Sequence, residues 1–189
     1  MAHVKTNPII EQLRGKVGDL VFKRYGDEII ISRKPDLAGR EPTAAQAGVR
    51  ERFRQAALYG KMVMADPATK TIYEVAAKAK GQPVFSLTVA DFFNAPSVDE
   101  VDLSGYAGRV GDAIVARAHD DFDVTALKVA VTQADGSAVE EGAATETPPK
   151  SGRWVYQATA AVPTGTTVKI TVTATDRPGH AGVKEASKQ

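Results

Sequence analysis

The two segments that decide the fold are residues 112–146, DAIVARAHDDFDVTALKVAVTQADGSAVEEGAATE, and residues 153–176, RWVYQATAAVPTGTTVKITVTATD. Both alternate apolar with other residues, and the apolar positions are Leu127, Val129 and Val131, then Trp154, Tyr156 and Ala158, then Val168, Ile170, Val172 and Ala174. Successive side chains of a β-strand point to opposite faces, so a two-residue repeat gives each strand one face to bury and one to wet. The pattern predicts two sheets packed face to face.

The C-terminal half of the chain contains about seven strand candidates. They span residues 98–103, 112–119, 124–133, 137–145, 153–160, 166–175 and 181–187. Asp135-Gly136 is a strong signal for a hairpin turn, and Pro163-Thr164-Gly165 and Pro178-Gly179 mark further turns. Short strands at this spacing, with one tryptophan at an inward position, predict an immunoglobulin-like sandwich.

The N-terminal 35 residues predict a β-hairpin. Val17 with residues 20–22, and then residues 29–31, form β-branched or aromatic runs, and Gly26 between them can supply the positive φ of a turn. The residues before the hairpin hold a short apolar patch. An isolated two-stranded hairpin is marginal in water, so we expect it to pack on a helix, to join a sheet or to pair with another chain.

Residues 44–93 carry helix signals. Thr43 with Gln46 has the capping-box pattern and predicts a helix over about 44–65. Asp66-Pro67 suits the N-cap and first position of a second helix, which Gly81 ends. Residues 84–94, VFSLTVADFFN, also fit a buried strand, but Pro83 in the first turn favours a third helix.

The predicted fold class is therefore α+β, in two parts. Residues 1–95 form a tail, a β-hairpin and two or three helices, and residues 96–189 form an all-β immunoglobulin-like sandwich. The break Asn94-Ala95-Pro96-Ser97 is the best candidate for the boundary between them.

Composition restricts the class of protein. The chain has 189 residues, a net charge of +1 and no cysteine, which excludes disulfides and thiolate metal sites. Charge is divided unevenly: residues 1–95 carry 15 Lys+Arg against 10 Asp+Glu, and residues 96–189 carry 9 against 13. Opposite signs would attract the two ends of neighbouring copies at short range. We find no secretory signal and no apolar run of the about 20 residues that span a bilayer, so we expect a soluble protein without membrane insertion.

Two resemblances follow from particular motifs. Asp120-Asp121-Phe122, Asp135-Gly136, Trp154-Val155-Tyr156 and the run from Thr173 to His180, TATDRPGH, resemble bacterial immunoglobulin-like repeats of surface proteins. The motifs GKVGDLVF, RKP, PTAAQ and RFRQA resemble a bacterial family known mainly from sequence, without an established activity. The resemblances imply a sandwich and a hairpin followed by helices, and they imply no site residues.

Aspartates gather in predicted loops, at Asp120, Asp121 and Asp123 and again at Asp176. Oxygen-rich loops can bind Ca²⁺, which takes about six to eight oxygens, but aspartates also cap turns by accepting backbone N–H groups. Because no D-x-D-x-D-G loop is present, we favour turn caps. We predict no metal site and no cofactor, and calcium at these loops stays open as the alternative.

Other candidate sites have simpler interpretations. His3, His119 and His180 are scattered, which does not favour zinc. The residues around Gly15 lack the spacing of a phosphate loop. Trp154 and Tyr156 could stack on a sugar, but their alternation favours the core. Arg50, Arg52 and Arg54 fit a solvated helix face better than a nucleic-acid site. We predict no catalytic residues and expect no enzyme; convergence of His119, Asp120 and Asp176 would revive that possibility.

The sequence is most consistent with a non-catalytic structural protein that assembles with copies of itself, or with other structural proteins, in a filament, an appendage or a phage-like particle. Exposed strand edges can pair with another chain. The predicted assembly residues are Ile9, Ile10, Leu13, Val17, Leu20, Phe22, Ile29 and Ile31. The alternative is an immunoglobulin-like module that binds a glycan or a protein. The compartment stays open between a cytoplasmic location and an extracellular appendage or virion reached by non-classical release.

Overall fold

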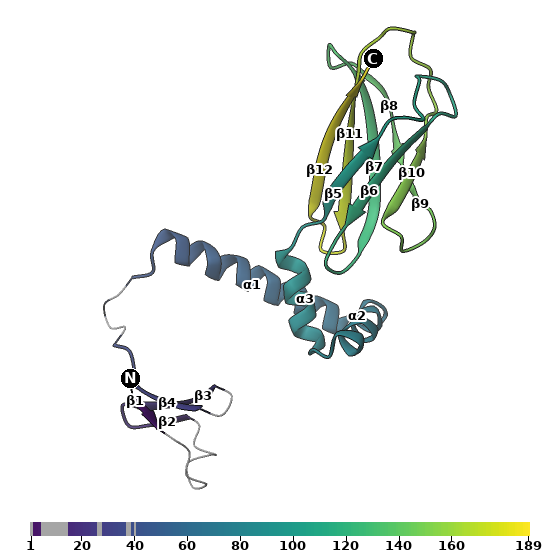
Figure 1. Cartoon of the computed structure of the whole chain (residues 1–189). Coiled ribbons are helices and arrows are strands. Elements are labelled where there is room, and N and C mark those ends of the chain that lie inside the picture. The colour runs from purple at the N-terminus through teal and green to yellow at the C-terminus, as the bar shows by residue number, and fades with distance from the viewer. Residues whose placement is uncertain (1, 5–14, 26–27, 37–38, 40) are drawn as a thin grey trace. The chain divides into compact units, whose positions relative to one another are not determined.

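The computed structural model describes residues 2–4, 15–25, 28–36, 39 and 41–189. The chain divides into two compact units, residues 1–46 and residues 47–189. Three antiparallel sheets of four strands each lie in the described part of the chain, one in the first unit and two in the second (Figure 1). The fold is thus mixed α+β and mostly β, as the alternation predicted.

The first unit contains a sheet with the strand order β1-β4-β3-β2. Its strands are β1 (Ala2–Val4), β2 (Gly15–Val17), β3 (Leu20–Tyr25) and β4 (Glu28–Arg33). The predicted hairpin is confirmed by the antiparallel pairing of β3 with β4. It is part of a larger sheet, because β1 pairs with β4 and β2 pairs with β3. The hairpin therefore has strand partners in its own chain, and β1 and β2 are the edges.

Three helices follow, as predicted: α1 (Ala44–Ala65), α2 (Pro67–Lys80) and α3 (Val84–Phe93). The capping box is present, since Gln46 N–H donates to Thr43 Oγ1 at 3.3 Å and Thr43 N–H donates to Gln46 Oε1 at 3.1 Å. Asp66 caps α2 by accepting from the backbone of Ala68 and Thr69, and Gly81 ends that helix in the left-handed conformation, with φ of 64°.

The apolar stripe of α1 is covered along only part of its length. Ala56, Gly60 and Val63 are buried, whereas Val49 and Phe53 keep 65% and 55% of their surface exposed. Gly60 lies where α1 meets α3: a Cβ atom there would lie 2.8 Å from both the Phe85 ring and Thr88 Oγ1. The first turns of α1 therefore present apolar side chains that the described residues leave uncovered.

The two glycines of α1 give a paired prediction. Gly60→Ala is expected to lower the free energy of unfolding by about 1–2 kcal/mol, because buried Thr88 cannot move away from a new methyl group. Gly48→Ala is expected to raise it by about 0.5–1 kcal/mol, since nothing lies within 4 Å and alanine is the better helix former. Thermal melts followed by helical circular dichroism measure both. Equal effects of the same sign would contradict the close α1–α3 packing.

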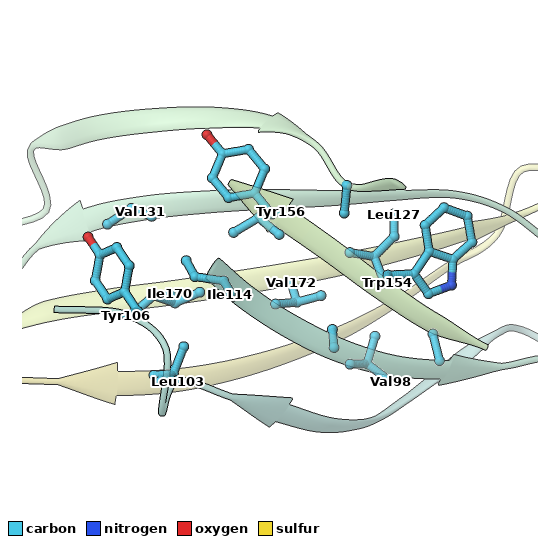
Figure 2. Close-up of a cluster of buried hydrophobic side chains, with 14 of the residues drawn as sticks. Val98, Leu103, Tyr106, Ile114, Leu127, Val131, Trp154, Tyr156, Ile170 and Val172 are labelled. Atoms are coloured by element: carbon cyan, nitrogen blue, oxygen red, sulfur yellow. The ribbon is translucent and has the colours of Figure 1, made fainter. Parts of the chain in front are cut away.

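The two sheets of the second unit share one hydrophobic core. One has the order β5-β6-β10-β9 and the other β12-β11-β7-β8. The strands are β5 (Ser97–Asp102), β6 (Ala113–His119), β7 (Val124–Gln133), β8 (Ala138–Ala143), β9 (Thr145–Glu146), β10 (Arg153–Gln157), β11 (Val168–Asp176) and β12 (Ala181–Lys188). Ile170, Val172, Leu127, Trp154 and Ile114 from both sheets meet in this core (Figure 2). All the alternating apolar positions predicted from the sequence are buried.

One predicted strand is divided between the sheets. Residues 137–145 were expected to form a single strand, but β8 pairs with β7, whereas β9 pairs with β10 in the other sheet. The passage between them is Ala144, which is buried and donates its backbone N–H to Leu127 O at 2.8 Å. Alternation alone does not reveal such a crossing, because exposed and less exposed side chains continue to alternate from Glu141 to Glu146.

The division of the chain lies at 46/47, whereas the sequence placed a boundary at 95/96. The helices α2 and α3 contact the loops of the sandwich. The Tyr73 ring of α2 stacks on Phe122, with ring centroids 4.2 Å apart, and Asn94, directly after α3, donates to Asp121 at 2.7 Å. Helices and sandwich thus form one unit, since aromatic and polar contacts connect them.

Candidate functional site

The predicted assembly residues fall into three groups in the structure. Ile9, Ile10 and Leu13 lie outside the described residues. Val17 and Leu20 are exposed, at 62% and 42% of their surface, and Phe22 and Ile31 are half-buried. Ile29 is only 1% exposed, so its side chain is not available to another chain, contrary to the prediction. An exposed apolar pair therefore remains at the turn between edge strand β2 and β3.

A second feature is a chain of buried and half-buried polar groups at the joint between the helices and the sandwich. Asp91 of α3 has no exposed surface. Its Oδ2 accepts a short hydrogen bond from the Tyr73 hydroxyl, which lies 2.7 Å from the Tyr59 hydroxyl. A tyrosine has one hydroxyl proton, so Tyr59 donates to Tyr73 while Tyr73 donates to Asp91. Three helices thus contribute one residue each to a hydrogen-bonded relay.

The loop between β6 and β7 adds two more carboxylates. Asp91, Asp120 and Asp121 each place one carboxylate oxygen within 4.8 Å of those of the other two. Asp120 uses Oδ2 to accept from the backbone N–H groups of Phe122 and Asp123, at 3.1 and 3.0 Å. Asp121 uses Oδ2 to accept from Asn94. We refer to Asp91, Asp120 and Asp121 as the acidic triad.

The environment of Asp91 disfavours its charged form. Burial raises the pKa of Asp91 to about 7, although the hydrogen bond from Tyr73 favours the charged form. The negative charges of Asp120, Asp176 and Asp121 raise this pKa further. Burial also raises the pKa of the Tyr73 hydroxyl far above its usual range. Burial and neighbouring negative charges thus both disfavour a charged Asp91.

The other two predicted loop aspartates, Asp176 and Asp123, have different roles. Asp176 is buried and uses Oδ1 to accept from the backbone N–H groups of Gly179 and His180, at 2.7 and 2.6 Å. Its Oδ2 lies 3.0 Å from His180 Nδ1. Asp123 accepts from the Arg177 guanidinium at 3.1 Å. Asp176 thus confirms the turn-cap interpretation, whereas Asp123 forms an ion pair with a residue 54 positions away and does not.

His119 does not form the cluster with Asp120 and Asp176 that would have indicated an enzyme. Its Nδ1 lies 2.6 Å from Asp99 Oδ2, and the pair is exposed. Asp176 contacts His180 instead. Trp154 and Tyr156 are buried, and Tyr156 donates to Glu140 at 2.9 Å, so neither offers a ring face to a sugar. Trp154 and Tyr156 are therefore core residues, as their alternation in the sequence predicted.

A groove lies beside the acidic triad. It encloses about 790 Å³ between one face of α2 and the loops at the end of the sandwich. Ile72 and Val75 of α2 line it together with His119, Asp120 and Phe122. Asp120 thus belongs to the triad and also lines the groove.

Among the described residues, no helix combines the length and apolar character needed to cross a bilayer.

Sequence reasoning missed Asp91 as a site residue. It lies four positions after buried Leu87 and therefore on the buried face of α3. A carboxylate on the apolar face of a predicted helix indicates a buried polar site, because burying it without a partner costs free energy. Its partners could not be inferred, since Tyr59, Tyr73 and Asp120 come from three other elements.

Comparisons with known proteins give little beyond this. No protein-family model matches the chain, and no curated protein matches it significantly. Among solved structures, the chain is similar to the crystal structure of CopC from Methylosinus trichosporium OB3b, at 12% sequence identity, over 49% of this chain and 89% of that chain. The TM-score of 0.36 is too low for that similarity to support an argument about fold or function.

Proposed function

We propose that the chain is a non-catalytic structural protein that assembles with copies of itself through its N-terminal strands. The observation that carries the proposal is an edge of the N-terminal sheet: within the described ranges, β2 has β3 as its one neighbouring strand. Strand β2 is an edge and is exposed at every residue, and Val17 and Leu20 present apolar side chains there. An unpaired edge offers backbone groups to a strand from another chain, and exposed apolar side chains add to the affinity.

Two further features support a second copy as the partner. The uncovered part of the α1 stripe, Val49 and Phe53, provides apolar surface of a kind that a helix normally buries. Residues 1–95 carry a surplus of positive charge and residues 96–189 a surplus of negative charge, so these segments of neighbouring copies would attract at short range. On this proposal the sandwich is an immunoglobulin-like domain, and it lies on the surface of the assembly.

The proposal predicts concentration-dependent polymers of the full-length protein. The double variant Val17→Lys with Leu20→Lys is expected to shift the sedimentation profile to monomer, because charged side chains blunt an edge strand. A variant that lacks residues 1–35 is expected to behave in the same way. Sedimentation velocity at several concentrations measures the change, and electron microscopy of the same samples shows the form of the polymer.

The matched control replaces exposed valines of the sandwich, as Val110→Lys with Val183→Lys. It adds the same charge elsewhere, and the polymers are expected to persist. A full-length protein that sediments as monomer at all concentrations would refute the proposal, as would a control that disassembles the polymer as completely as the N-terminal variant.

The groove beside α2 favours a second candidate function, an immunoglobulin-like module that binds a glycan or a protein. It offers apolar Ile72 and Val75 opposite polar loop residues, which is a common composition for a binding site. This function predicts a monomer whose melting temperature rises with ligand. A glycan array and a pull-down with Val75→Glu as the negative control separate it from self-assembly.

A further inference from the structure

We propose that the acidic triad binds a hard divalent cation, with Ca²⁺ as the preferred ion, at the joint between α3 and the β6–β7 loop. The ligand set differs from the loop aspartates weighed from the sequence, because it includes Asp91 from a helix and leaves out Asp123 and Asp176. One carboxylate oxygen of each triad member lies within 4.8 Å of those of the other two, so a single ion can contact all three.

An independent observation comes from the unused oxygens. Asp91 is completely buried, yet its Oδ1 has no hydrogen-bond partner; only Oδ2 is engaged, by Tyr73. Asp120 repeats this arrangement, with Oδ2 capping the loop and Oδ1 buried without a partner. Buried polar atoms are almost always satisfied, so an unsatisfied one needs an explanation, and a bound ion is one of the explanations. Two such oxygens belong to the same cluster of three carboxylates.

Charge supports the same assignment. Among the described residues, no salt bridge involves any member of the acidic triad. Lys80 donates to the backbone carbonyl of Asp121 at 2.7 Å, not to its carboxylate, and Arg177 pairs with Asp123. Like charges at this separation repel strongly in a partly buried site. A cation between them would remove the repulsion and satisfy the free oxygens together.

The ligand atoms determine the class of ion. All three are carboxylate oxygens, which suit hard cations such as Ca²⁺ and Mg²⁺ rather than ions that prefer sulfur or imidazole. Exposure increases from buried Asp91 through half-buried Asp120 to exposed Asp121, so the ion has a route from solvent and keeps positions for water. Ca²⁺ tolerates irregular geometry and about six to eight ligands, whereas Mg²⁺ requires a nearly regular octahedron.

The rival occupant is a proton on Asp91, which would leave the carboxyl group neutral without any metal. Titration calorimetry of the full-length, chelator-treated protein near pH 7 with CaCl₂, MgCl₂ and ZnCl₂ separates the two. We expect a single Ca²⁺ site and weaker binding of Mg²⁺. Asp91→Asn and Asp120→Asn are expected to abolish the Ca²⁺ heat, and Asp121→Asn to weaken binding by about tenfold or more.

The matched control is Asp123→Asn, in the same loop and with the same change of charge but outside the triad. It is expected to keep Ca²⁺ binding within about threefold. The surface variant Asp121→Asn keeps the test valid if a buried variant fails to fold, since its unchanged circular dichroism separates lost binding from lost structure. Absence of heat in the wild-type protein, binding of Zn²⁺ alone, or equal Ca²⁺ binding by wild type and Asp121→Asn would each overturn the proposal.

A second readout uses the neighbouring tyrosines. Tb³⁺ occupies calcium sites and emits when an adjacent tyrosine is excited, and the Tyr73 hydroxyl contacts Asp91 directly. We expect sensitised Tb³⁺ emission from the wild-type protein, its displacement by excess Ca²⁺, and a loss of most of the signal in Tyr73→Phe. Emission that Ca²⁺ does not displace, or that Asp91→Asn retains in full, would contradict binding at the acidic triad.

Discussion

Replacing Ile170 with alanine is expected to lower the free energy of unfolding of the sandwich by about 2–5 kcal/mol. Ile170 has no exposed surface and lies on β11, which pairs with both β7 and β12. Truncation removes apolar contacts and leaves a cavity that strands held on both sides cannot close. Denaturant unfolding followed by Trp154 fluorescence measures the loss, because Trp154 is the one tryptophan of the chain and lies in the same core.

The control for Ile170 is Val183→Ala on the neighbouring strand β12. Val183 is an exposed residue, so its truncation is expected to change stability by no more than about 0.5 kcal/mol. A loss below about 1 kcal/mol for Ile170→Ala would show that the two sheets do not enclose a tightly packed core around β11.

Glu140→Gln is expected to cost about 2–3 kcal/mol near neutral pH. Glu140 lies on β8, and its Oε2 accepts four hydrogen bonds from residues near the end of β10, in the other sheet. The donors are the Tyr156 hydroxyl at 2.9 Å, the Thr159 backbone and hydroxyl, each at 2.6 Å, and the Ala160 backbone at 3.1 Å. Hydrogen bonds to a charged acceptor are the stronger kind, and the neutral amide weakens all of them together.

The cost of Glu140→Gln is expected to depend on pH. Burial opposes the charge of Glu140, but the hydrogen bonds from Thr159 and Tyr156 outweigh it, so the pKa lies below its ordinary value of 4.5. The folded protein therefore binds fewer protons at this group than the unfolded chain does near that pH. The contribution is present above about pH 4.5 and is lost as the pH falls through the folded-state pKa. The wild type and the variant should converge in acid.

Stability curves of both proteins across this pH range test the prediction. The neighbouring Glu141→Gln is the control, because Glu141 is exposed and forms a surface ion pair with Lys128; its cost is expected to stay within about 0.5 kcal/mol. A difference between wild type and Glu140→Gln that stays constant into strong acid would show that the carboxylate charge is not what matters.

The sequence allowed much of the regular structure to be predicted, because local chemistry determines it. Strands β6, β7, β10 and β11 were visible because each buries one face, and helix α2 because Asp66 and Gly81 satisfy its ends. Strand β1 could not be predicted: Ala2, His3 and Val4 are too few to show alternation, and only pairing with β4 makes them a strand. Sequence patterns thus identify the elements whose own residues favour a helix or a strand. They do not identify an element such as β1, which depends on its partner.

The acidic triad could not be predicted for a related reason. Asp120 and Asp121 are adjacent in a predicted loop, but Asp91 lies 29 positions before Asp120, within a segment for which the sequence predicts only a helix. The three meet because Tyr73 stacks on Phe122 and Asn94 contacts Asp121. Such a site depends on how a helix docks on a loop, which no periodicity encodes.

The passage of the backbone through Ala144 has a mechanical consequence. Residues 138–146 run along one sheet as β8 and along the other as β9, so a covalent connection joins the two layers at that point. In a chain of linked copies under tension, load entering one layer reaches the other through this connection as well as through side-chain contacts. Because β9 pairs with β10 at only two residues, we expect that ladder to detach before β8 leaves β7 if the layers are pulled apart at this point.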